Sequence, residues 1–137
     1  MARIPAAARQ NSIGGAAAFG RFYFEQLSRA FQQGSPSSLD GLFAPSCQIC
    51  VSLSESAAQL ERAGQHHAGT TLRVTFSSAT VFNSKSRQVL VRLEQFSVPV
   101  VDKTGKKVDT TKAGSGAFVA VLSFDKHWVV QDLGRPA

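Results

Sequence analysis

The sequence has no long apolar run, and it has few cysteines and few acidic side chains. No stretch approaches the roughly 20 consecutive apolar residues that a membrane-spanning helix needs. The opening residues 1–9 lack the apolar centre of a secretory signal, so no signal segment is visible in this chain. We also find no glycine-rich phosphate loop and no serine, histidine and aspartate pattern of a hydrolase. The chain as given is therefore expected to be soluble.

The composition is that of one folded domain. The chain has 137 residues, of which 43% are hydrophobic and ten are phenylalanine. This length matches a single domain, and this apolar content excludes the disordered class. Residues 1–13 lack periodicity and predict a linker or tail, so we expect the domain to cover residues 14–137.

The net charge of +6 lies almost entirely in the second half of the chain. Residues 1–64 carry five basic and four acidic side chains, whereas residues 65–137 carry ten basic and five acidic ones. A nucleic-acid interface would place these charges on one stripe between aromatic residues, but here the aromatic residues alternate as core positions do. We therefore expect solvated basic loops and no nucleic-acid partner. Weak attraction to an anionic envelope surface remains an alternative.

The first half of the chain has the periodicity of helices. Aromatic and aliphatic residues recur at three- and four-residue spacing from Gly15 to Gln33, which predicts an amphipathic helix. Ser35-Pro36 predicts the start of a second, short helix that Pro45 ends. Ser46 is a candidate cap for a third helix that ends at Gly64.

Beyond Gly69 the period changes to two, which indicates strands. The predicted strands are Thr70–Phe82, Arg87–Val98, Ala113–Phe124 and His127–Leu133. Short polar turns connect them, so we expect an antiparallel meander of four to five strands. The first strand is too long to stay straight in a domain of this size, and Ser77-Ser78 interrupts its alternation, which predicts a β-bulge there. In the second strand the expected core face carries Val89, Val91 and Leu93.

Three helices followed by a bent antiparallel sheet form an α+β domain. The order of elements, the segment Phe19-Gly-Arg-Phe-Tyr-Phe24 and the closing strand resemble the nuclear transport factor 2-like cone fold. Gly15-Ala-Ala-Ala-Phe19, Ser46-Cys47-Gln-Ile-Cys50 and His67-Ala-Gly69 resemble a group of uncharacterised actinobacterial lipoproteins. This resemblance implies an extracytoplasmic domain in the cell envelope. It also implies an upstream lipid anchor followed by a linker, and the chain is expected to begin inside that linker.

Cys47 and Cys50 are the strongest chemical feature, and four interpretations compete for them. A redox pair would need a strand before the helix, and a zinc site would need two more ligands, which the adjacent His66 and His67 cannot comfortably provide. Two buried free thiols would fit a helix face. A disulfide would fit an exported domain with two cysteines and no third, and the resemblance supports this choice.

Catalytic residues are weakly supported. Relatives of the cone fold include isomerases and dehydratases that place an acid or a histidine near a tyrosine in an internal pocket, so Tyr23 and Asp132 are the candidate pocket residues. A core role is the commoner use of such a tyrosine. We expect Glu94 to form an exposed ion pair with Arg92, and His66, His67 and His127 to face solvent. No cofactor or metal ion is expected.

Four strand aromatics have two alternative uses. Phe96, Phe118, Phe124 and Trp128 would form an apolar sheet face for a homodimer or another partner if they point away from the first helix, and otherwise they pack beneath the helices. The sequence favours a non-catalytic extracytoplasmic domain that binds an unknown small molecule or protein. The alternative is a small-molecule isomerase or dehydratase with a pocket inside the cone.

Overall fold

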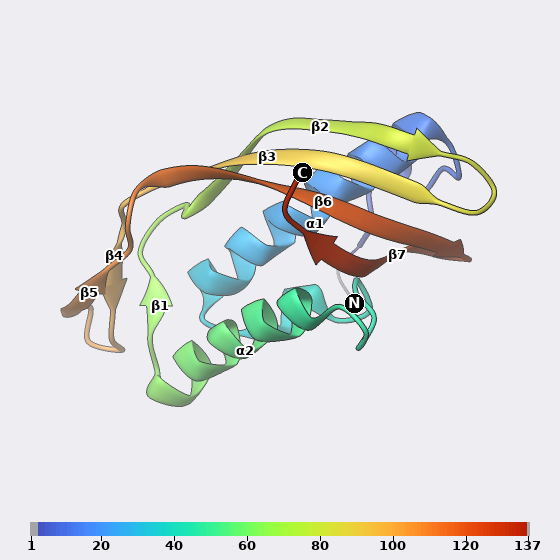
Figure 1. Ribbon diagram of the computed structural model, residues 1–137. Coiled ribbons are helices and arrows are strands. Elements are labelled where there is room, and N and C mark those ends of the chain that lie inside the picture. The colour runs from blue at the N-terminus through green and yellow to red at the C-terminus, as the bar shows by residue number, and fades with distance from the viewer. Residues whose placement is uncertain (1–2, 137) are drawn as a thin grey trace.

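The computed structural model describes residues 3–136 and shows a mixed α+β fold with two α-helices and two antiparallel sheets. In Figure 1 the larger sheet arches over the helices, and the smaller sheet lies at one end of this arch. The elements, in chain order, are η1 (Ala6–Ala8), α1 (Ile13–Gln33), η2 (Pro36–Leu39), α2 (Gln48–Ala63), β1 (His66–His67), β2 (Leu72–Phe82), β3 (Arg87–Gln95), β4 (Pro99–Val101), β5 (Lys107–Thr110), β6 (Gly114–Asp125) and β7 (His127–Gly134).

Helix α1 is the centre of the fold and has clear start and stop signals. The Ser12 side chain accepts a hydrogen bond from the Gly15 backbone N–H, and Gly34 ends the helix in the left-handed conformation. Phe19, Tyr23 and other members of its apolar stripe are almost completely buried against the sheet. Within residues 3–136, no helix is long and apolar enough to cross a membrane.

The sequence predicts three helices, but the described residues form two α-helices. The segment Pro36–Leu39 is a 3-10 helix of four residues, so only α1 and α2 are α-helices in the described chain. Pro36 starts this turn correctly, but Gly41 has a φ of 77° and Pro45 follows shortly after. These two residues stop the helix before a second turn can form. The cap of α2 is Cys47, whereas the sequence predicts Ser46.

The larger sheet has the strand order β2-β3-β6-β7, with every neighbouring pair antiparallel. The predicted core face of β3 is confirmed, because Val89 and Val91 are fully buried and Leu93 is almost so. The irregularities in β2 lie between Val74 and Phe76 and between Ala79 and Val81, on either side of the predicted bulge position. Two bulges spread the bend of the strand over its length.

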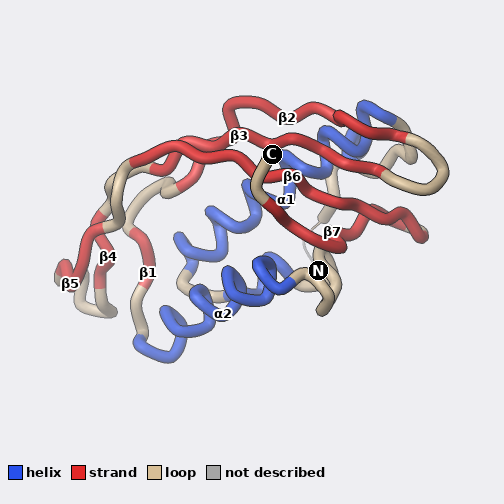
Figure 2. The backbone as a smooth tube through the Cα atoms, in the orientation of Figure 1, coloured by secondary structure: helices blue, strands red, loops and turns tan. Residues whose placement is uncertain are grey.

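The smaller sheet, with the order β1-β4-β5, is absent from the sequence prediction. Strand β3 ends at Gln95, three residues earlier than predicted, and the chain then forms β4, whose Val101 pairs with His66. Figure 2 shows these short strands below the end of the larger sheet, beside the C-terminal end of α2. Strands of two to four residues are too short to show a period of two, so the pattern could not reveal them.

The segment expected to be a linker contacts the domain. Ile4 and Ala8 are buried members of the core, and the Gln10 carbonyl accepts a hydrogen bond of 2.8 Å from Trp128 Nε1. A Cβ atom at Gly15 would lie 1.8 Å from this same carbonyl oxygen, so only glycine permits the close approach. Residues 3–12 thus close one end of the core, although the segment lacks the periodicity of a regular element.

Three of the four strand aromatics point inward. Trp128 is fully buried, Phe124 packs edge-on against it with ring centroids 5.0 Å apart, and Phe118 stacks on Phe24 of α1. Only Phe96 lies elsewhere, with the Arg73 guanidinium 5.7 Å from its ring centroid. Trp128 therefore belongs to the core and Phe118 and Phe124 pack against it, so these three residues follow the alternative in which the strand aromatics pack inward.

Candidate functional site

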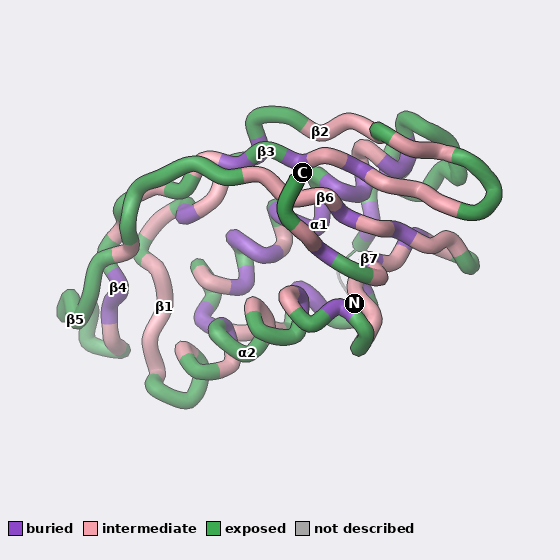
Figure 3. Tube along the Cα trace, in the orientation of Figure 1, coloured by how far each residue is buried: buried purple, intermediate pink, exposed green. Residues whose placement is uncertain are grey.

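A cavity of about 650 Å³ lies between α1, α2 and the inner face of the sheet. Phe24, Leu27 and Phe31 line it from α1, and Leu60 lines it from α2. Spacings of three and four residues place the α1 side chains on one helix face. Figure 3 shows that the helix opposite them, α2, is mostly exposed or partly buried, in contrast to α1. The volume lies within the range of about 300–1,000 Å³ that is usual for small-molecule sites.

The cavity lining includes one histidine, His67, which contacts two neighbouring side chains. His67 Nδ1 lies 2.6 Å from the hydroxyl oxygen of the buried Thr71, and its ring stacks on Phe31 with centroids 5.1 Å apart. Partial burial lowers the pKa of His67, and the nearby His66 lowers it further. The neutral ring is therefore favoured. This placement corrects the prediction that His67 faces solvent.

The lowered pKa of His67 predicts a stability that falls as the solution becomes acidic. Because the unfolded chain takes up the proton first, the free energy of unfolding decreases as the pH drops below about 6.5. Urea unfolding of the parent protein and of His67→Gln, at about pH 7.5 and pH 5.5, measures this effect. The variant should lose less stability between the two conditions than the parent. An identical loss in both proteins would contradict the assignment.

The cavity opens to solvent beside the end of β3 and the start of β6, where the lining residues Gln95 and Lys112 are exposed. Gln95, Lys112, Gly114 and Gly116 line it, and Gly114 lies opposite Gln95 in the strand register. By strand alternation Gly114 and Gly116 share the inward face of Phe118, and a Cβ atom at either glycine would meet nothing within 4 Å. The two glycines thus leave open space where side chains would otherwise fill the cavity.

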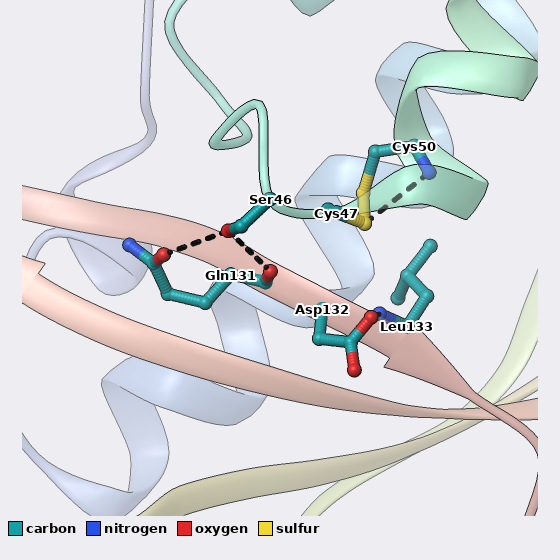
Figure 4. Close-up of a disulfide and its surroundings, with 6 residues drawn as sticks. All are labelled: Ser46, Cys47, Cys50, Gln131, Asp132 and Leu133. Carbon is teal, nitrogen blue, oxygen red and sulfur yellow. Dashed lines mark hydrogen bonds between the residues drawn. A yellow bond between two sulfur atoms is a disulfide. The ribbon is translucent and has the colours of Figure 1, made fainter.

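The Cys47–Cys50 disulfide closes the first turn of α2, the helix that lines one side of the cavity. The two Cα atoms are 5.2 Å apart, both residues are fully buried, and Cys47 Sγ accepts a hydrogen bond from the Cys50 backbone N–H. Just before it, the Ser46 hydroxyl donates to the Gln131 carbonyl of β7 at 3.0 Å (Figure 4). The start of α2 is therefore attached to the sheet. Complete burial also argues against a redox role, which needs an accessible sulfur atom.

Tyr23 and Asp132 do not meet in this structure. Tyr23 is completely buried, is not among the cavity-lining residues, and its hydroxyl has no hydrogen-bond partner within residues 3–136. Asp132 is exposed on β7, where its carboxylate accepts a bond from the Leu133 backbone N–H (Figure 4). Burial raises the pKa of Tyr23, which keeps the phenol neutral. This pair therefore forms no acid–base site.

Replacing Tyr23 with phenylalanine is expected to stabilise the protein. The change removes a buried hydroxyl without a partner in the described chain and keeps the ring that packs edge-on against Phe24. We expect the free energy of unfolding to rise by about 1 kcal/mol in urea unfolding experiments. A decrease of similar size would show that the hydroxyl makes a stabilising hydrogen bond, and it would restore Tyr23 as a candidate donor.

The remaining polar candidates have structural contacts. Glu94 pairs with Arg73 at 3.0 Å, whereas the sequence predicts Arg92, which instead lies over the Phe76 ring. Arg73 rather than Arg92 pairs with Glu94 because residues directly across from each other on neighbouring strands approach more closely than residues two apart on one strand. His127 Nδ1 lies 2.9 Å from the Trp128 carbonyl oxygen. The described part of the chain contains no group of three or more potential metal ligands from histidine, cysteine, aspartate and glutamate.

Comparison with protein families decides the classification. The family of unknown function DUF6318 matches residues 3–134. The chain belongs to this family. The comparison with curated proteins gives no match. Among solved structures, the domain is similar to the crystal structure of the intermembrane space region of the chloroplast protein ARC6, with 9% sequence identity, a TM-score of 0.55, and coverage of 86% of this chain and 94% of that one.

These comparisons support the fold and leave the function open. The similarity to ARC6 concerns the arrangement of elements alone, because its sequence identity is far too low to carry an activity. The sequence interpretation did not identify Gln95, Thr71 or Lys112 as lining residues. One feature of the sequence could have indicated the cavity. The strand that begins at Gly114-Ser-Gly116 has two glycines, and glycines in a strand often mark a place where another group approaches the backbone closely.

Proposed function

We propose that this DUF6318 domain is an extracytoplasmic binding domain that holds an apolar small molecule between α1, α2 and the curved sheet. The cavity of about 650 Å³ carries this proposal. Aromatic and aliphatic side chains from α1, α2 and the sheet line it, together with polar side chains such as Gln95, Thr111 and Lys112. Such a distribution is typical of a ligand site, because apolar area supplies affinity and a few polar groups orient the ligand.

The disulfide supports an oxidising compartment. Disulfides persist outside the reducing cytosol, and here the bridge joins the N-cap residue of α2 to the first turn of that helix. Lysis of cells of the source organism directly into a denaturant that contains an alkylating reagent, followed by intact-mass measurement of the non-reduced protein, tests the location. Two unmodified cysteines are the expected result. Two alkylated thiols would contradict an extracytoplasmic domain.

The finer classification belongs to the same proposal. A long helix before an antiparallel sheet that bends around it supports a variant of the nuclear transport factor 2-like cone. The resemblance to actinobacterial lipoproteins supports an upstream lipid anchor. Metabolic labelling with a radioactive fatty acid, applied to the whole gene product in its own cells, should label the protein. An unlabelled protein in the soluble fraction would refute the anchor but not the cavity.

A neutral apolar fluorophore tests the binding function directly. N-phenyl-1-naphthylamine becomes strongly fluorescent in apolar sites, so the parent protein should show saturable emission. Gly116→Leu places a side chain into the open space opposite Leu93 and should reduce this affinity by at least about tenfold. The matched control is Ala117→Leu, which adds the same side chain on the opposite face of β6.

Both variants should keep the parent circular dichroism spectrum, because neither position needs a positive φ. Saturable binding that Gly116→Leu weakens and Ala117→Leu preserves would support the cavity as the site. Binding that both variants retain would place the fluorophore elsewhere and overturn the proposal. The absence of saturable binding by the parent protein would do the same.

The enzymatic alternative has no supporting observation. It requires Tyr23 and an acid or histidine to converge in one cavity, but the Tyr23 hydroxyl is enclosed by the core and Asp132 lies at the surface. His67 does line the cavity, and its partner there is the Thr71 hydroxyl. We therefore propose binding without chemistry.

A further inference from the structure

Some polar side chains that line the cavity already form hydrogen bonds within the protein, and others do not. The Thr111 hydroxyl donates to the Phe96 carbonyl at 2.7 Å and accepts from the Val98 backbone N–H at 2.9 Å. Thr71 and His67 are bonded to each other. In contrast, the side chains of Gln95 and Lys112 make no hydrogen bond or ion pair with any residue in the range 3–136. These two side chains are available to a ligand.

The cavity lining carries positive charge and no negative charge in the described part of the chain. No aspartate or glutamate of the described chain lines the cavity, whereas Lys112 contributes a basic side chain at its mouth. The Gln95 amide adds neutral hydrogen-bond donors on the neighbouring strand. An ammonium and an amide together recognise an anionic oxygen, because charge-assisted hydrogen bonds are stronger than neutral ones. A cationic group would meet repulsion here.

The apolar part of the cavity continues inward from this mouth. Beyond Gly114, Gly116 leaves the inner face of β6 without a side chain, and Phe24, Leu27 and Phe31 line the cavity from α1. A narrow hydrocarbon chain fits between a bare strand and a row of helix side chains. Burial of such a chain contributes about 0.8 kcal/mol for each methylene group.

From these observations we infer that the ligand is a single-chain amphiphile with an anionic head, a carboxylate or a phosphate. Its hydrocarbon chain lies against α1 and the glycine positions of β6, and its head lies at Lys112 and Gln95. This inference rests on the proposed binding function, since it names the ligand class of the same cavity. It adds a direction for the ligand, with its head at the mouth and its tail inside.

Four ligands with the same hydrocarbon chain test the inference: dodecanoate, dodecyl phosphate, dodecanol and dodecyltrimethylammonium. Isothermal titration calorimetry below the micelle concentrations measures the affinity of each for the parent protein. At least one anion should bind about tenfold more tightly than dodecanol, and the cation should bind most weakly. The ratio between the two anions identifies the head group.

Lys112→Gln should remove the advantage of the anions and leave the affinity for dodecanol unchanged. The matched control is Lys107→Gln, which neutralises an exposed lysine of β5 that does not line the cavity and should preserve the advantage. Equal affinities for dodecanol and both anions would overturn the inference and leave the binding function intact. Failure of all four ligands and of the neutral fluorophore to bind would overturn both.

Discussion

Replacing Trp128 with alanine is expected to lower the free energy of unfolding by about 4 kcal/mol, because this indole is the largest of the fully buried side chains in the described chain. It packs edge-on against Phe82 and Phe124, and it lies 5.7 Å from the Arg87 guanidinium. Alanine would leave a large void in a close-packed core. Guanidinium chloride unfolding of the purified variant measures the loss.

The variant Trp128→Phe separates packing from hydrogen bonding. It keeps an aromatic ring but removes the donor to the Gln10 carbonyl, so we expect it to retain more stability than the alanine variant. This bond connects β7 to the segment before α1, which the sequence analysis predicts to be a linker. A change of less than about 0.5 kcal/mol in the alanine variant would indicate that Trp128 lies at the surface, as the alternative of a sheet-face interface requires.

Loss of the disulfide is expected to lower the free energy of unfolding by about 2 kcal/mol, because the bridge closes a short loop of the unfolded chain. The double variant Cys47→Ser/Cys50→Ala isolates this effect, since a serine can still cap the first turn of α2. The melting temperature should fall by roughly 8 °C. Differential scanning calorimetry of the parent and the variant measures both quantities.

The same change should weaken ligand binding, because α2 provides the Leu60 wall of the cavity and its first turn is joined to β7 through Ser46. Adding a phosphine reductant to the parent protein should reproduce the lower melting temperature of the double variant. If the parent retains its melting temperature after mass spectrometry shows complete reduction, the bridge does not stabilise the fold. The matched control is the double variant, which should not respond to the reductant.

The sequence predicted the helices and strands correctly where a long segment with a regular apolar period packs one face against the core. Helix α1 and strands β2, β3, β6 and β7 are recovered because each buries a regular set of apolar side chains, as the Val89 and Val91 face shows. It failed where the pattern was too short. The 3-10 helix at Pro36–Leu39 lacks the residues that an α-helix needs, and β1, β4 and β5 are too short to alternate visibly.

The candidate site was less predictable than the fold, because residues far apart in the sequence form it. His67 lies on β1 and Lys112 lies in the loop between β5 and β6, and both line one cavity only when the two sheets form. The residue types of Tyr23 and Asp132 suit an acid–base pair. However, Tyr23 lies on the face of α1 that packs into the core, and Asp132 lies on the exposed side of β7. Residue type indicates possible chemistry, whereas direction depends on packing.

The sequence by itself determined the α+β class, the aromatic helix, the antiparallel sheet and the separation of two cysteines that one helical turn can join. Local spacing controls these features, and spacing is visible in one dimension. Only the tertiary structure decided that three strand aromatics pack inward, that His67 becomes partly buried beside Thr71, and that a cavity lined by Gly116 remains between the helices and the sheet. Each depends on which surfaces meet when α1, α2 and the sheet pack together, since burial is a property of the assembled fold.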